Sequence, residues 1–247
     1  MEWDALIIAS AICLGAGVLT GLTGFGFSVF AVPLLLLVLP AQHVVVVALA
    51  LVVATSVVLL LSRELRAAVD LRTALGLWAL SLAGLPLGAL IMQAVDANWV
   101  VALTGAVLLG YAVWRLRATG AGGGGLGWMI TCGLLGGALT TSTGLNGPAV
   151  AMYVSGQART PEQQVATMAV YVGGISACGF VLLMASGQVS ADLATPLPAL
   201  GVASVVGTIL GRWVGARAAH KLDRLTLLLL AAMGLWCLVR SAWSLVA

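Results

Sequence analysis

Ten apolar segments, separated by short polar stretches, follow one another along the chain. They are 5–20, 27–39, 42–61, 72–92 and 98–114, followed by 126–140, 148–156, 165–186, 195–214 and 224–245. The longer segments reach the roughly 20 residues that a helix needs to cross a bilayer. Apolar and polar residues do not alternate with period two, so helices rather than a β-barrel are the expected spanning elements. The pattern predicts an all-α polytopic membrane protein.

A sequence rich in glycine and threonine occurs twice. GVLTGLTGFG at 17–26 returns as GALTTSTGLN at 137–146, with Gly, Leu, Thr, Thr and Gly at identical offsets. A second pattern, G-x3-G-x7-D, closes both halves, at 84–96 and at 211–223. Self-similarity at a fixed period indicates an internal duplication.

The duplication defines two halves and a linker between them. The first repeat is predicted to be 1–116 and the second 126–247, joined by a glycine-rich linker at 117–125. In each half, the first two apolar segments are too short to cross separately: the 13 residues of 27–39 reach only about 20 Å of a hydrocarbon core of about 30 Å. Each half is therefore predicted to be a re-entrant or broken helical hairpin (5–39 and 126–156), followed by three transmembrane helices. These helices are 42–61, 72–92 and 98–114 in the first half, and 165–186, 195–214 and 224–245 in the second.

Composition agrees with a protein that lies in a lipid bilayer. The 247 residues are 62% hydrophobic and 8% charged, whereas soluble domains carry about 25% charged residues. The net charge of +3 does not indicate a nucleic-acid partner, because the basic residues lie beside membrane spans. Each of the four cysteines lies inside an apolar stretch without C-x-x-C spacing, which is typical of core thiols rather than of metal or redox sites.

Lysine and arginine positions predict the orientation in the membrane. Ten of the eleven gather in stretches that one face can hold: Arg63, Arg66, Arg72, Arg115, Arg117, Arg159, Arg212, Arg217, Lys221 and Arg224. Placing them in the cytoplasm leaves Arg240 toward the outside, together with the acidic N-terminus. The first hairpin then enters from outside and the second from the cytoplasm, so the halves are expected to be inverted-topology repeats whose tips meet near the midplane. The expected location is the bacterial cell inner membrane.

The first hairpin tip has the features of an anion site. Its residues are Thr23, Gly24, Phe25, Gly26, Phe27 and Ser28. The glycines allow unusual backbone angles and close approach of a ligand to the main chain. A helix that restarts at about Phe27 presents unpaired N–H groups and a partial positive charge, which can bind an anion without a cationic side chain. Thr23 and Ser28 can add hydroxyl donors.

The second tip is richer in hydrogen-bond donors. It contains Thr143, Gly144, Leu145, Asn146, Gly147 and Pro148. Pro148 suits the first turn of a restarting helix, where its missing N–H costs nothing. Asn146 can cap that helix or donate its amide to a ligand. The alternative for both tips is that these polar residues only satisfy the backbone of broken helices.

These motifs resemble those of a known family. Gly24-Phe25-Gly26-Phe27 leading to Val32-Pro33-Leu34, paired with Gly144-Leu145-Asn146-Gly147-Pro148 leading to Tyr153, resembles the TauE/SafE family of sulfite and organosulfonate transporters. The resemblance covers both halves and implies a carrier for a small anion. Two positions depart from it. Many relatives have a run of three glycines at the first tip, whereas here Phe27 follows Gly26, and Val165 stands where many relatives carry an arginine. If that arginine helps to bind the anion, this chain binds it differently, or its substrate is less charged.

The sequence lacks the features of other functional classes. It contains no nucleophile elbow, P-loop, zinc-protease motif or metal-ligand spacing, so no enzymatic activity, cofactor or metal is expected. All eight carboxylates lie in loops or at segment ends, whereas ion-coupled carriers usually place an ionisable residue inside the membrane. Because an inside-negative potential drives anions outward, export by alternating access is favoured. An uptake permease, a channel for a small neutral solute and a non-transporting membrane subunit remain alternatives, and a homo-oligomer remains open.

Overall fold

The described structure is almost entirely helical. The computed structural model describes residues 3–117, 125–157, 159–193 and 195–246, and these residues contain no strand. In chain order the elements are α1 (Trp3–Thr23), α2 (Gly26–Leu35), α3 (Ala41–Leu60), α4 (Arg63–Ala68), α5 (Leu71–Ala94), α6 (Ala97–Arg117), α7 (Leu126–Thr143), α8 (Pro148–Ser155), α9 (Pro161–Ala185), the 3-10 helix η1 (Ala191–Leu193) and α10 (Leu197–Val246). Among the described residues, six stretches are long and apolar enough to cross a membrane; they lie in α1, α3, α5, α6, α9 and the first part of α10. The prediction of an all-α polytopic membrane protein is confirmed.

Each hairpin has a long first arm and a short second arm. In the first hairpin α1 has 21 residues and α2 has 10; in the second, α7 has 18 and α8 has 8. The expectation that neither arm is long enough to cross does not hold for α1, which continues through Gly21 to Thr23. Alpha-helical hydrogen bonding continues to the tip, where the Gly24 N–H donates to the Thr20 carbonyl at 2.8 Å.

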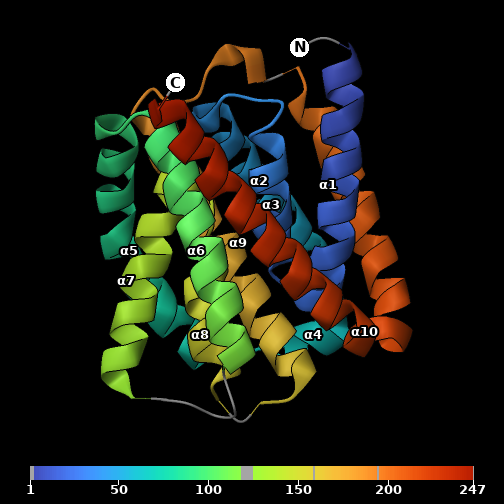
Figure 1. Cartoon of the computed structure of the whole chain (residues 1–247). Coiled ribbons are helices and arrows are strands. Elements are labelled where there is room, and N and C mark those ends of the chain that lie inside the picture. Colours follow the sequence, from blue (N-terminus) through green and yellow to red (C-terminus); the bar gives the residue numbers. More distant parts are fainter. Residues whose placement is uncertain (1–2, 118–124, 158, 194, 247) are drawn as a thin grey trace.

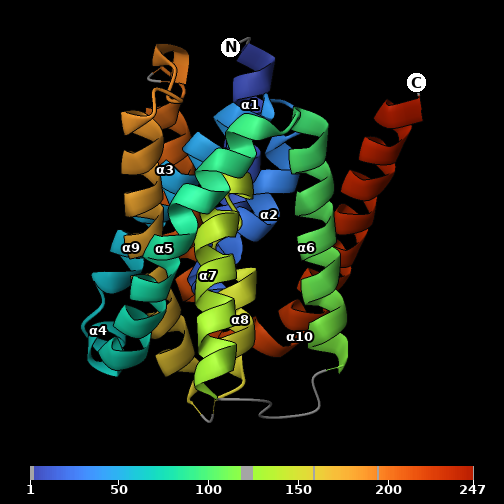
Figure 2. The ribbon, with the colours of Figure 1, turned by 90° about the vertical axis from the view of Figure 1, so that its left-hand side faces the viewer.

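Corresponding helices of the two halves run in opposite directions. Figure 1 shows α1 and α3 running away from the end of the bundle where the N-terminus lies, whereas α7 and α9 run toward it. Helix α10 is continuous in its backbone from Leu197 to Val246, where two helices, 195–214 and 224–245, were expected. Its first part descends and its last part rises again, so both of its ends lie at the end of the bundle that holds the N-terminus (Figures 1 and 2).

The most extensive helix contacts join the two halves of the sequence. Helix α1 packs on α10, and α5 packs on α7. Glycines make both contacts close: a Cβ on Gly211 would lie 2.1 Å from the Val18 carbonyl oxygen, and a Cβ on Gly84 would lie 2.3 Å from that of Leu134. Small residues allow such approach between helices in lipid. Further contacts join α3 to α9 and α6 to α10, so helices of the two halves are interleaved throughout the bundle.

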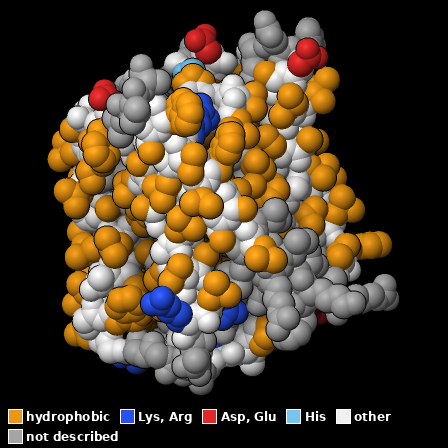
Figure 3. Space-filling model, viewed as in Figure 1, with side chains coloured by type: hydrophobic (Ala, Val, Ile, Leu, Met, Phe, Trp, Pro, Cys, Tyr) orange, Lys and Arg blue, Asp and Glu red, His pale blue; other side chains and the backbone are white. Residues whose placement is uncertain are grey.

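Charged side chains separate toward the two ends of the bundle. Figure 3 shows an apolar belt, with most of the visible lysine and arginine side chains near the end opposite the N-terminus. We call this the arginine-rich end; its described arginines include Arg63, Arg66, Arg72, Arg115 and Arg117. At the other, arginine-poor end, Arg240 donates from Nη1 to the Leu36 carbonyl oxygen at 2.9 Å. This distribution agrees with the orientation expected from the sequence.

Candidate functional site

The two hairpin tips touch each other inside the bundle. The Ser28 hydroxyl, in the first turn of α2, donates to Asn146 Oδ1 at 3.4 Å. The Phe25 ring lies 2.7 Å from the position that a Cβ on Gly147 would occupy. Both Ser28 and Asn146 have 0% exposure. The structure thus brings together two segments that are 118 residues apart in sequence.

Asn146 connects both tips to a third element. Its amide Nδ2 donates to the Ser176 hydroxyl on α9 at 2.5 Å. Helix α8 begins at Pro148, as predicted, but its N-cap residue is Gly147 and no side chain caps it. Asn146 therefore does not cap α8. Ser176 was not among the predicted site residues, although a serine (Ser56) lies at the corresponding position of the first half.

Two of the predicted hydroxyl donors bond to their own helices. Thr23 Oγ1 donates to the Leu19 carbonyl oxygen, and Thr143 Oγ1 donates to that of Leu139, both at 2.9 Å. The Thr143 hydroxyl also accepts the Leu145 N–H at 3.3 Å. Such back-bonding uses the hydroxyl proton within its own helix. In this conformation the Thr23 and Thr143 hydroxyls therefore donate within α1 and α7 rather than toward a ligand.

The starts of α2 and α8 are both free of side-chain caps. Phe25 and Gly147, at their N-cap positions, make no side-chain capping hydrogen bond. The first-turn N–H groups of a helix have no intrahelical acceptor, and they carry the positive end of the helix dipole. The N-terminal ends of α2 and α8 lie at the two tips, which touch each other and are buried. This arrangement can stabilise negative charge without a cationic side chain.

Each tip packs against a helix from the other half of the chain. Gly24 has φ +82°, and a Cβ there would lie 2.8 Å from the Val165 carbonyl oxygen on α9. Gly144 has φ +76°, and a Cβ there would lie 3.6 Å from the Val45 Cα on α3. Val165, the position of the departure from the family pattern, therefore lies directly against the first tip.

We expect Gly24→Ala to destabilise the protein more than Gly144→Ala, although both require a side chain at positive φ. That conformation costs roughly 1 kcal/mol for a non-glycine residue, and at Gly24 the new methyl group also meets the α9 backbone. Thermal unfolding in detergent measures the difference. Gly187→Ala is the matched control, because Gly187 has φ +71° and no atom within 4 Å of its Cβ position. Equal losses at all three positions would show that the contact between Gly24 and Val165 is not tight.

An aromatic cluster holds the first tip from the side. The Phe25 ring meets Tyr111 of α6 edge to face, with ring centroids 6.3 Å apart, and Tyr111 stacks on Trp114 at 6.1 Å. Phe27 and Leu145 are fully buried within the apolar core. Tyr111 was not among the predicted site residues, and its spacing in the sequence gives no signal of this contact.

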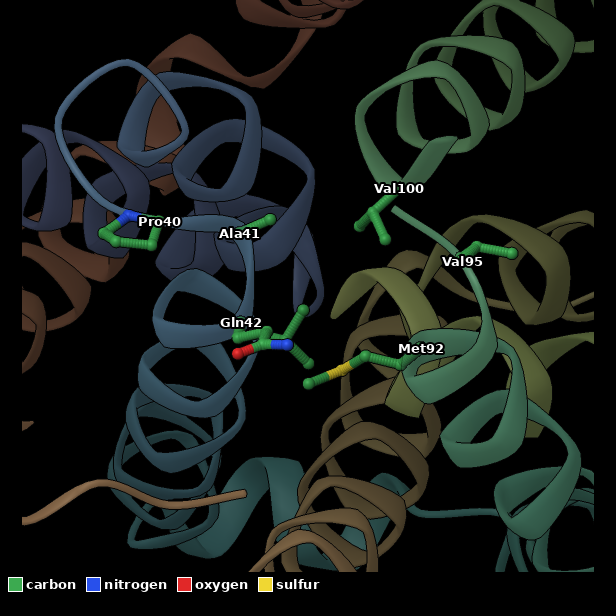
Figure 4. A pocket seen from close by; sticks show the side chains of 7 residues that line it. Pro40, Ala41, Gln42, Met92, Val95 and Val100 are labelled. Carbon is green, nitrogen blue, oxygen red and sulfur yellow. The ribbon is translucent and has the colours of Figure 1, made fainter. Parts of the chain in front are cut away.

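A pocket at the arginine-poor end leads toward the second tip. It has a volume of about 280 Å³ and is lined by Pro40, Ala41, Gln42, Val45, Met92, Val95 and Val100. Figure 4 shows Gln42 and Met92 pointing toward each other from α3 and α5. Val45 both lines this pocket and packs on Gly144. Six of its seven lining residues have apolar side chains, and Gln42 supplies a polar one.

Comparison with known proteins agrees with the motifs at the tips. A protein-family model described as "Sulfite exporter TauE/SafE" matches residues 9–237. The chain belongs to the TauE/SafE family. The match includes both tips and both halves, so the TauE/SafE chain is a multi-pass membrane protein of a transporter family. Searches of curated proteins and of solved structures returned no significant match.

Proposed function

We propose that this TauE/SafE protein carries a small anion, such as sulfite or an organosulfonate, and holds it between the two hairpin tips. The observation that carries the proposal is the meeting of two uncapped helix starts, α2 and α8, in a buried place. Backbone N–H groups at these starts supply the attraction for negative charge. Ser28 and Asn146 supply polar side chains beside them. The substrate-binding residues are Thr23 to Ser28 and Thr143 to Pro148.

Alternating access requires that the tips become open to one side at a time. In this structure they are covered, since Ser28, Thr143 and Asn146 all have 0% exposure. The opposite directions of corresponding helices are what inverted-topology repeats require. The close contacts of α1 with α10 and of α5 with α7 suggest that each moving unit combines helices of both halves. We propose that the unit containing α1 and α10 and the unit containing α5 and α7 move against each other.

The pocket beside Val45 favours a substrate with an apolar part. A short carbon chain can contact the side chains of Met92, Val95 and Val100. The N-terminal ends of α2 and α8, at the tips, receive the charged group. An organosulfonate has both features, whereas sulfite has only the second. A channel for a small neutral solute remains the second candidate. The residue of α9 that packs on the first tip is Val165, which is uncharged, whereas many relatives carry an arginine at this position.

We expect export to be driven by the membrane potential. One charge that crosses 100 mV gains about 2.3 kcal/mol, which corresponds to a gradient of about 50-fold. Proteoliposomes with an imposed potassium diffusion potential test this: alkanesulfonate flux should saturate, carry current, and reverse when the potential is reversed. Accumulation that follows a proton gradient would favour an uptake permease. Non-saturating flux of a neutral solute, insensitive to potential, would favour a channel.

A further inference from the structure

Arg159 is a buried cation whose hydrogen bonding is incomplete. It lies between α8 and α9 at the arginine-rich end, and its side chain is only 8% exposed. Its Nη2 donates to Asp70 Oδ2 at 2.7 Å, to Thr73 Oγ1 at 2.7 Å and to Gln157 Oε1 at 2.5 Å. Its Nη1 is buried and has no hydrogen-bond partner. Buried charged groups normally have all their donors satisfied, so this unused edge of the guanidinium is a feature that requires an explanation.

A polar pocket adjoins this side chain. Its volume is about 430 Å³, and its lining comprises residues 67–70, Gln157, Arg159 and Gln163. One liquid water occupies about 30 Å³, so the pocket is large enough for a small oxyanion and several waters. Gln163 closes the capping box of α9 with Thr160. The pocket is therefore built from three elements that the described hydrogen bonds hold in place.

The Asp70 carboxylate leaves Nη1 of Arg159 without a hydrogen-bond partner. This carboxylate is fixed as the N-cap of α5, accepting the Thr73 N–H at 3.1 Å and the Thr73 hydroxyl at 2.9 Å. These bonds, the backbone N–H first, lower the pKa of Asp70 below its usual value, with Arg159 contributing. The carboxylate meets Nη2 only. Nη1 remains free, and Arg63, Arg66 and Arg72 add positive charge to this end of the bundle.

The pocket lies at about the same height along α9 as the first tip, because Gln163 lines the pocket and Val165, two residues further along α9, packs on Gly24. At the arginine-poor end, Val45 itself lines a pocket and packs on Gly144. Each tip thus has a pocket at its own end of the bundle, apolar at the arginine-poor end and charged at the arginine-rich end.

We propose that the pocket beside Arg159 binds a small tetrahedral oxyanion, such as sulfate or the sulfonate group, with Arg159 Nη1 as its main donor. Nη1 is covered in this structure, so binding requires a rotation of the Arg159 side chain that turns Nη1 toward the pocket. Arginine suits this ligand because its planar array of N–H groups matches two oxygens of an oxyanion. If the proposed function holds, the anion binds at this site before it reaches the first tip. The existence of the binding site does not depend on the proposed function.

Sulfate titration of the full-length protein in nanodiscs, by calorimetry at constant ionic strength, tests the proposal. We expect saturable binding that Arg159→Gln weakens at least tenfold and that Asp70→Asn tightens several-fold. Asp70→Asn removes a competing charge, while asparagine remains a good N-cap residue. Arg63→Gln is the matched control, since it removes the same charge from α4 outside the pocket, and it should change the affinity less than twofold. If Arg159→Gln does not fold, the increase in sulfate affinity expected of Asp70→Asn still tests the proposal.

The outcomes separate this site from the proposed function. Absence of saturable sulfate binding, or equal losses in Arg159→Gln and Arg63→Gln, would overturn the site. Binding that survives Arg159→Gln but is lost in Asn146→Leu would place sulfate at the tips and also overturn it. If sulfate binds at Arg159 while proteoliposomes show no anion flux, the site stands and the proposed function fails.

Discussion

Gly137→Ala is expected to destabilise the protein by about 3 kcal/mol or more, the largest effect we predict for a single added methyl group. A Cβ at Gly137 would lie 2.0 Å from the Ser81 carbonyl oxygen, a backbone atom that cannot rotate away. The methyl group therefore forces α7 and α5 apart along their whole contact. It also disturbs Ser81, whose hydroxyl donates to the Gly133 carbonyl and bonds to the Tyr171 hydroxyl. Thermal unfolding in detergent, or steric trapping in bicelles, measures the loss.

Gly127→Ala, on the same helix, is the control. Gly127 has no atom within 4 Å of its Cβ position. Alanine is the better helix former by about 1 kcal/mol, so this variant should be as stable as the wild type or slightly more stable. Gly211→Ala tests the equivalent contact between α10 and α1, and it should resemble Gly137→Ala. A Gly137→Ala protein as stable as the Gly127→Ala protein would show that α5 and α7 are not packed this closely.

The G-x3-G pattern can be found in the sequence, but the helices that its glycines bring together cannot. Gly84 and Gly88 were matched with Gly211 and Gly215 as equivalent positions, and nothing in their spacing names a partner helix. The structure pairs Gly84 with α7 and Gly211 with α1, each from the other half. Partner choice depends on how the whole bundle closes, which a local pattern does not record.

The tips could be located from sequence, but the roles of their side chains could not. Gly24 and Gly26 were predicted to allow unusual backbone angles; Gly24 has positive φ, whereas Gly26 does not, and Gly144, for which no such prediction was made, also has positive φ. Pro148 correctly marked the start of α8. The threonine hydroxyls were expected to face a ligand, whereas they bond to the carbonyls four residues earlier. Both uses are open to a hydroxyl at the end of a helix, and only the local backbone geometry decides between them. The length of α1 was underestimated because its last turn is rich in glycine and threonine.

Asn146→Asp is expected to reduce alkanesulfonate flux at pH 8 by about 100-fold or more. Asparagine and aspartate have the same shape, and Ser28 and Ser176 can both donate to the new carboxylate. A like charge about 4 Å from the transported anion costs about 4 kcal/mol at an effective dielectric constant of 20. Burial raises the pKa of the introduced carboxyl above the ordinary value near 3.9. The group is charged above that raised pKa and neutral below it, so flux should recover as the pH falls toward 5.

Asn146→Leu separates charge from hydrogen bonding in the same experiment. It removes the bonds to Ser28 and Ser176 without adding a charge, so its flux should be low and should not change with pH between 5 and 8. The sulfonate group stays ionised over this range, which leaves the introduced carboxyl as the group whose titration changes the flux. Recovery at low pH in Asn146→Asp alone would place the anion beside Asn146. Equal, pH-independent losses of flux in both variants would assign Asn146 a purely structural role. Its contribution would then consist of its hydrogen bonds to Ser28 on α2 and Ser176 on α9.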